Sequence, residues 1–275
     1  TRTILVGVDL SGKDLTGTIL TGADLTDANL AGLDLSDKDL TGTILVGADL
    51  SNANLAGVDL SYKDLTGTIL VGLDLSDKDL TGTILAGADL TNANLAGVNL
   101  SGKNLIEAIL VDVDLSGKDL SGTILTGADL SGANLDNVDL SGKDLSGTIL
   151  HGVDLSGKDL TRTILWKANM INANLSNATL TGADLTGAVL TGAILTGANL
   201  ENAVLTNAIL NCVGHPICIP TGSGLSGMDL TGMDLSNRDL SGMDLTGTIF
   251  TEADLSNSIL TGVDLSGKDL SNTIL

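Results

Sequence analysis

The strongest constraint on the fold is a period of five residues that runs along the whole sequence. The chain divides into 55 consecutive five-residue units without an insertion, and leucine ends 51 of them, at residue numbers divisible by five. The residue before the leucine is Asp or Asn in 35 units; the residue after it is mostly Ser or Thr, followed mostly by Gly. This period matches neither a helix, with about 3.6 residues per turn, nor a simple strand, so it predicts a repeat architecture.

Each unit has the pattern of a short strand followed by a turn. The leucine and the residue two before it are apolar or small, and the residue between them is usually polar, which is strand-like alternation over three residues. Gly after Ser or Thr is typical of a turn, because Gly accepts positive φ and a nearby Asp or Asn can bond the backbone. Repetition of strand and corner predicts a solenoid whose coils stack through backbone hydrogen bonds.

The units ANLAG (residues 53–57) and ADLTG (residues 183–187) resemble the pentapeptide-repeat family. This resemblance implies an all-β fold, a right-handed quadrilateral parallel β-helix (solenoid) with four pentapeptides per coil. The leucine and the residue two before it would point inward. At 20 residues per coil, the 275 residues would make about 13–14 coils. We expect the β-helix over residues 1–210, a non-repeat segment over 211–224 and a continuation over 225–275.

Lysines recur at intervals of 40 residues, which is two coils. One series comprises Lys38, Lys78, Lys118 and Lys158, and the other comprises Lys63, Lys103 and Lys143, so a double-coil repeat covers about residues 41–160. These lysines occupy a position that the family normally gives to a small inward residue. Burying an unpaired ammonium would cost several kcal/mol, so we expect the stems to follow the corner and the heads to reach solvent. The Asp or Asn after each lysine offers an acceptor.

The lysines are interpreted either as a ladder that fixes the register of the coils or as part of a binding surface. Beside the second series, the outward position alternates between isoleucine and a polar residue, and contiguous exposed apolar residues can mark an interaction site. Trp166 takes an outward position where the lysine pattern ends. The candidate interaction surface therefore comprises Lys63, Lys103, Lys143, Ile44, Ile84, Ile124 and Trp166.

Residues 211–224 interrupt the motif and contain both prolines and both cysteines. Proline removes a backbone donor, which predicts a loop or a distorted coil. Cys212 and Cys218 could form a disulfide around His215, remain free thiols, or join His215 in a metal site with three ligands at most. A disulfide, together with the missing initiator Met, favours an extracellular location over the cytoplasm.

Composition narrows the function classes. The net charge of −21 argues against nucleic acid as a direct partner, because phosphates would be repelled. No apolar run approaches the roughly 20 residues that cross a bilayer. No nucleophile–base set emerges, so we expect a protein that is not an enzyme and needs no cofactor. Regular Ser and Thr positions suggest surface recognition such as ice binding, but solenoid corners use these residues anyway.

Two functions remain in competition. The first is a structural or interaction rod whose partner is another protein or a second copy, stacked head to tail into a filament through uncapped ends. The second follows from the resemblance, because some pentapeptide-repeat proteins are acidic DNA mimics that occupy the DNA groove of gyrase, a type II topoisomerase. Those relatives often carry Phe at the leucine position and a C-terminal helix, whereas here only Phe250 is of that kind.

Overall fold

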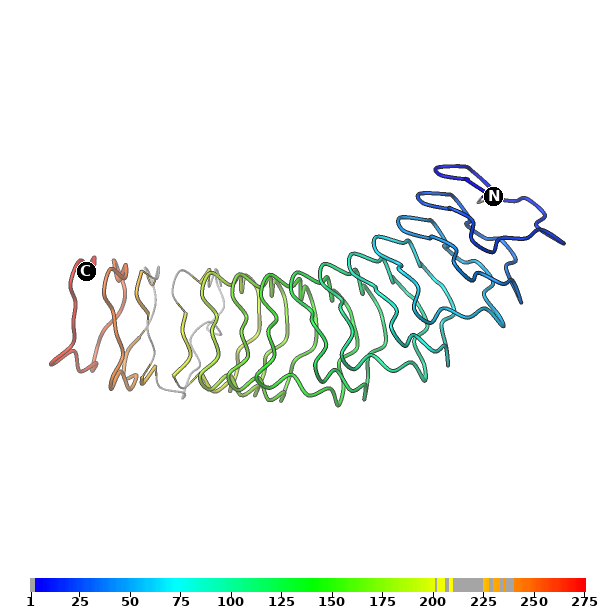
Figure 1. Ribbon diagram of the computed structural model, residues 1–275. Helices are drawn as coiled ribbons and strands as arrows, with labels where there is room; N and C mark the ends of the chain where they lie inside the picture. Colours follow the sequence, from blue (N-terminus) through cyan, green and yellow to red (C-terminus); the bar gives the residue numbers. More distant parts are fainter. Residues whose placement is uncertain are drawn as a thin grey trace. The chain divides into compact units, whose positions relative to one another are not determined.

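In the computed structural model each part of the chain folds as a parallel β-solenoid, whose coils follow one another along the sequence (Figure 1). The structure describes residues 3–200, 202–205, 208–209, 225–227, 230–232, 235 and 240–275. The chain divides into two compact units, Thr1–Val138 and Asp139–Leu275, and the same coil is repeated within each. The all-β solenoid with four pentapeptides per coil, predicted above, is confirmed.

The strands consist of single paired residues. The residue before each leucine pairs in parallel with the residue 20 positions later, as Asp24 does with Ile44 and Asp49 with Ile69. Backbone hydrogen bonds flank each pairing; Leu25 N donates to Ile44 O (2.9 Å) and Ile44 N to Ala23 O (3.0 Å). The described part of the chain contains no helix and no longer strand. Nor do these residues include a helix long and apolar enough to cross a bilayer.

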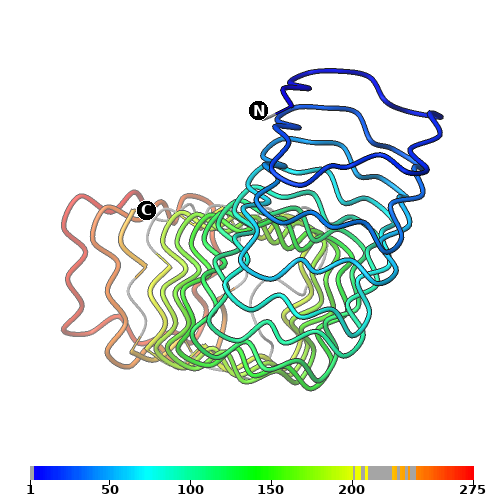
Figure 2. The ribbon, with the colours of Figure 1, turned by 45° about the vertical axis from the view of Figure 1, so that its right-hand side comes forward.

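A two-residue turn joins neighbouring sides of a coil, and the corners stand out where a coil is seen in outline (Figure 2). The third residue after the leucine donates its N–H to the leucine carbonyl, as in Ala48 N to Leu45 O (2.9 Å). The second turn residue has positive φ, as a type II turn requires, and is Gly in most corners. In corners where this residue is not Gly, it is usually Asn or Asp, because both tolerate this conformation. Tyr62 (φ 56°) and Glu107 (φ 55°) are among the exceptions.

The Asp or Asn before the leucine stabilises the following corner with its side chain. Asp49 Oδ1 accepts hydrogen bonds from Ser51 N (2.9 Å) and Ser51 Oγ (2.5 Å). Asn29 Oδ1 accepts a bond from Ala31 N at 3.0 Å. The turn chemistry predicted from the sequence is therefore present, and Asp and Asn are interchangeable for the backbone bond.

Inward side chains form a continuous core in each unit. Leu50, Leu65 and Ala48 are fully buried, as expected for the leucine position and the position two before it. Phe250 takes the place of leucine and is also fully buried. Small residues alternate with leucine because the interior of a coil has room for one large and one small side chain per side.

Among the described residues, one step between coils is longer than 20 residues. A Cβ atom on Gly227 would lie 2.7 Å from Asn202 Oδ1, a contact made elsewhere by corners 20 residues apart, as between Gly72 and Asn52 (2.6 Å). The step from Asn202 to Gly227 is therefore 25 residues. The chain still divides into five-residue units across this stretch. In the coil that begins at Leu225, however, the Gly227 corner stacks on a corner one unit earlier in the sequence than a period of 20 residues would give.

Candidate interaction surface

The lysines at inward positions are held by main-chain carbonyls of the preceding coil. Lys63 Nζ donates to Leu40 O at 2.5 Å, and Lys103 Nζ donates to Leu80 O. In the other series, Lys78 Nζ donates to Leu55 O at 2.6 Å. The expected acceptor was the Asp or Asn that follows each lysine. For these three lysines the acceptors are instead leucine carbonyls 23 residues earlier, because the stem runs back across the corner, whereas Lys118 Nζ donates to Val98 O at 3.3 Å.

Threonine makes the same bond in the alternate coils. Thr83 Oγ1 donates to Leu60 O and Thr123 Oγ1 to Leu100 O, both at 2.8 Å and again 23 residues back. Each leucine carbonyl has two lone pairs, and the turn N–H occupies only one of them. Lys63 and Thr83 therefore make the same side-chain bond to a leucine carbonyl in successive coils. Lys63, Lys103 and Lys143 are half-buried, and their role in binding stays a prediction.

Substitutions at Lys63 test this equivalence. We expect Lys63→Thr to leave the free energy of unfolding nearly unchanged, because Thr can bond Leu40 O as Thr83 bonds Leu60 O. Lys63→Val removes the donor and should cost about 1 kcal/mol. Urea denaturation of both variants measures the difference. Equal stability of the Thr and Val variants would show that the carbonyl bond contributes nothing.

The predicted isoleucines lie on one side of the coils and alternate with polar residues. Ile84 is 43% exposed and Ile124 is 45% exposed, whereas Ile44 is half-buried. Asp64 pairs directly with Ile84, and Asn104 pairs with Ile124. Apolar side chains are therefore separated by polar ones along this side. The sequence reasoning did not single out Ile69 and Ile106, which are also exposed.

Trp166 lies on a corner of the second unit and is 44% exposed. Lys167 Nζ lies 4.2 Å from the centre of its ring, so part of the indole face makes a cation–π contact within the chain. Whether Trp166 also contacts a partner stays a prediction. Cys212, Cys218 and His215 lie outside the described residues. Among the residues that are described, no group of three or more His, Cys, Asp or Glu side chains could hold a metal ion.

One side of the first unit carries outward aspartates on most of its coils. We call it the acidic column, and its outward residues are Asp39, Asp59, Asp79, Asn99 and Asp119. Bonds from the Ser61 side chain and backbone hold the pKa of Asp59 below its ordinary value of 3.8, and the Asp79 charge opposes this more weakly. Thr81 likewise lowers the pKa of Asp79. The column is therefore ionised at neutral pH.

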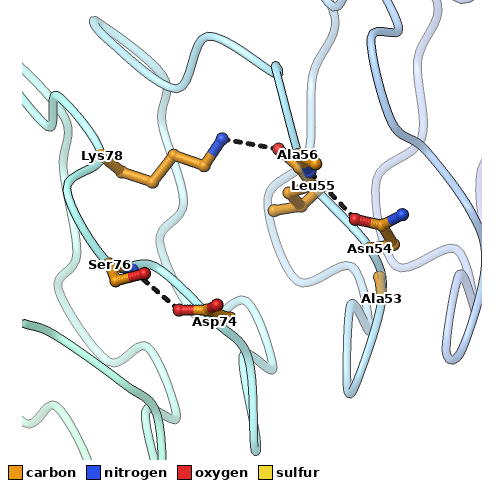
Figure 3. A pocket seen from close by; sticks show the side chains of 7 residues that line it. All are labelled: Ala53, Asn54, Leu55, Ala56, Asp74, Ser76 and Lys78. Carbon is orange, nitrogen blue, oxygen red and sulfur yellow. Dashed lines mark hydrogen bonds between the residues drawn. The ribbon is translucent and has the colours of Figure 1, made fainter.

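A hollow of about 290 Å³ borders the acidic column at the preceding corner (Figure 3). Ala53 and Ala56 leave the space, and Asn54, Asp74, Ser76 and Lys78 line it. Figure 3 shows Lys78 directed at the main chain of Leu55 and Asp74 directed at Ser76, which donates its N–H at 3.0 Å. Asp74 and Ser76 bond each other, and Asn54 accepts a bond from Ala56 N, so the polar groups that line the hollow are engaged and form no convergent catalytic set.

Tyr62 stands at the opposite corner of the acidic column and is 78% exposed. A Cβ atom on Gly82 would lie 2.4 Å from Tyr62 Cδ1, so the ring lies across the Gly82 corner of the next coil. Sequence reasoning did not single out Tyr62. The available signal was its place in the unit, because Tyr62 occupies a position that is Gly in most units.

The carboxylate bonds predict acid destabilisation. Because Asp34, Asp74 and Asp79 have folded pKa values below 3.8, chiefly through bonds from Ser36, Ser76 and Thr81, their contribution is complete above the unfolded value. This stabilisation is lost as the pH falls through the pKa values of the folded state. The urea concentration at the unfolding midpoint should therefore decrease once the pH is below about 4. Asp74→Asn keeps the turn bond and should reduce this dependence. A midpoint that is constant or rises from pH 5 to pH 3 would contradict the assignment.

Known proteins of solved structure resemble this chain only distantly. No curated protein sequence matches the chain. Among solved structures, a trypsin-treated variant of QnrB1, a plasmid-mediated fluoroquinolone resistance protein, is 18% identical, with 90% of this chain and 89% of that chain covered and a TM-score of 0.41. HetL of the cyanobacterium Nostoc sp. strain PCC 7120, a pentapeptide repeat protein involved in heterocyst differentiation regulation, is 26% identical, with coverages of 94% and 91% and a TM-score of 0.26.

The sequence profile described as pentapeptide repeats matches nearly the whole chain. Its matches overlap from residue 3 to residue 213 and resume over 229–267 and 239–275. Together with coils of four five-residue units, buried leucines and corners of positive φ, this match shows the fold to be the right-handed quadrilateral β-helix of that family. The chain belongs to the pentapeptide-repeat family.

Proposed function

We propose that the protein is a non-enzymatic interaction protein whose acidic column binds a basic protein surface that otherwise holds duplex DNA. The observation that carries this proposal is the charge density of the first unit, counted over all four sides of its coils. Residues 21–120, five coils of the first unit, contain 16 acidic and 5 basic residues, a net charge of −11. At about 4.8 Å per coil they extend about 24 Å, or one net charge per about 2.2 Å. Duplex DNA carries one per about 1.7 Å.

The arrangement of the carboxylates supports the proposal further. Asp39, Asp59 and Asp79 lie on successive coils of one side, and their pKa values are lowered mainly by side-chain bonds from Thr41, Ser61 and Thr81. The lysines nearest to this column donate to backbone carbonyls, and the Lys63 charge also lowers the pKa of Asp39 and Asp59. A regular row of fixed negative charges favours a partner with a row of Lys and Arg side chains. DNA gyrase is the partner that we propose.

A supercoiling assay with DNA gyrase and the 275-residue chain tests this function. We expect inhibition at micromolar protein, and we expect the triple variant Asp39→Asn, Asp59→Asn, Asp79→Asn to lose most of it. The matched control is Asp49→Asn, Asp89→Asn, Asp129→Asn, which removes the same charge from a different side. Both variants keep their turn bonds, since Asn29 shows that Asn accepts the same backbone bond. Absence of inhibition by the unmodified chain, or equal loss in both variants, would refute the proposal.

End-to-end association is a second candidate. In the 275-residue chain, Leu5, Leu10 and Leu15 of the first coil are only half-buried. Ile4 is 71% exposed and Ile19 is 83% exposed. Stacking a second copy on this coil would bury these side chains and pair its free backbone groups. We expect the mass from light scattering to rise with concentration and Ile19→Asp to reduce this rise. A constant monomer mass at high concentration would exclude stacking.

A further inference from the structure

Tyr62 occupies a position that the fold does not require to be aromatic. In the first unit, the same corner of other coils is Gly, at positions 22, 42, 82, 102 and 122, each with positive φ. The left-handed conformation is unfavourable for a residue with a side chain, and Tyr lacks the short polar group with which Asn or Asp offsets this. The ring is nevertheless mostly exposed, so burial of Tyr62 does not compensate for the strain.

The ring and two carboxylates of the acidic column are brought to the same pair of corners. Tyr62 N donates to Thr81 O at 2.8 Å, which fixes the Tyr62 corner beside the next one, where the ring covers Gly82. Asp59 Oδ1 accepts from Ser61 N and Asp79 Oδ1 from Thr81 N, both at 2.8 Å. Each carboxylate is therefore held next to the residue that begins one of these two corners.

The neighbouring ammonium group is bonded to the preceding coil. Lys63 follows Tyr62 in the chain, but its Nζ reaches back to Leu40 O in the preceding coil, whereas the Tyr62 ring reaches forward to Gly82. In addition to the Ser61 bonds, the Lys63 charge lowers the pKa of Asp59, and the Asp79 charge on the adjacent coil raises it more weakly. A second cation placed at this point would face both carboxylates and the exposed side of an aromatic ring.

We infer that Tyr62, Asp59 and Asp79 together bind an arginine side chain of the protein partner. A guanidinium group is planar, stacks on aromatic rings and can pair with two carboxylates at once, which a compact ammonium group does less well. Tyr62 supplies the stacking surface, and the two aspartates supply acceptors on the side of the ring that faces the column. This inference rests on the proposed function, because it names the site, here called the anchor, at which a basic partner would bind the acidic column.

Binding of short peptides to the 275-residue chain tests the anchor. The probes are hexa-arginine and hexa-lysine peptides with blocked ends. Tyr62 is the only tyrosine in the chain, so its ring signals in NMR spectra report contact directly. We expect hexa-arginine to shift these signals and to bind more tightly than hexa-lysine. Tyr62→Gly, which restores the residue found at this corner in other coils, should weaken hexa-arginine about two- to fivefold.

Two controls separate the anchor from general effects. Tyr62→Phe keeps the ring and should bind hexa-arginine as the unmodified chain does. Asn52→Gly replaces another positive-φ corner residue without changing charge, and should also bind normally. If Tyr62→Gly binds hexa-arginine as tightly as the unmodified chain, or if the ring signals do not move, the anchor is refuted. If the anchor is refuted but the chain still inhibits gyrase, the proposed function stands. If the anchor binds arginine but the chain does not inhibit gyrase, the proposed function is refuted and the anchor stands.

Discussion

Leu70→Ala is expected to lower the free energy of unfolding by about 2–5 kcal/mol, because it removes a fully buried side chain and leaves a cavity in the core of the first unit. Leu15→Ala is the matched control: it changes the same position of the unit in the first coil, where leucine is only half-buried. The control should cost less than half as much. Urea denaturation followed by circular dichroism measures both.

Solenoids transmit stability mainly between neighbouring coils, so the loss at Leu70 should be local. Hydrogen exchange should speed up first in the backbone amides of the coils next to it, such as Leu50 N and Ile69 N, which bond across adjacent coils. A Leu15→Ala variant as unstable as Leu70→Ala would contradict the assignment of Leu70 to a closed core and Leu15 to a half-open one.

Gly97→Ala is expected to destabilise the protein more than Gly87→Ala, although both corners have positive φ (71° and 64°). The conformation alone should cost about 1–2 kcal/mol at either site. At Gly97 a Cβ atom would also lie 2.0 Å from Asp77 Oδ1 and 3.0 Å from Asp77 Cγ, so the Asp77 side chain must move. At Gly87 the nearest atom is Gly67 N at 3.8 Å. The total cost at Gly97 should reach about 2–3 kcal/mol.

The double variant Asp77→Gly, Gly97→Ala isolates the steric part of this effect. Removing the Asp77 side chain should bring the cost of Gly97→Ala down to that of Gly87→Ala, as measured by urea midpoints. If the two single glycine variants are equally unstable, the close approach between corner side chains of successive coils has no energetic consequence.

The five-residue frame was sufficient to predict the core and the corners. Leucine ends nearly every unit, so the inward positions of Leu50 and Ala48 followed directly, as did the turn bonds of Asp49 and Asn29. The acceptor of Lys63 did not follow. It lies 23 residues earlier, and a periodic pattern does not say which backbone atom of the preceding coil the end of a flexible stem reaches.

Two other features depend on which corners of successive coils lie on each other, and the five-residue pattern of the sequence does not specify this. The 25-residue step from Asn202 to Gly227 spans residues 211–224, where the motif is interrupted but the count of five is preserved, so the sequence does not indicate that the sides are displaced. Likewise, Tyr62 looks like an isolated substitution of Gly until stacking places its ring on Gly82. The candidate surface predicted from the sequence emphasised lysines and isoleucines. The structure draws attention instead to the acidic column beside them, where the side chains are exposed and ionised.

The salt dependence of the affinity for DNA gyrase tests the central claim, that the acidic column is the binding surface. A partner held by several charge pairs should bind the unmodified 275-residue chain more weakly as the salt concentration rises from about 50 to about 200 mM, which brackets the physiological ionic strength. The triple variant Asp39→Asn, Asp59→Asn, Asp79→Asn should bind more weakly at low salt and show a shallower dependence, whereas Asp49→Asn, Asp89→Asn, Asp129→Asn should keep most of both. No binding by the unmodified chain, or affinities and slopes that are the same in both variants, would contradict the account.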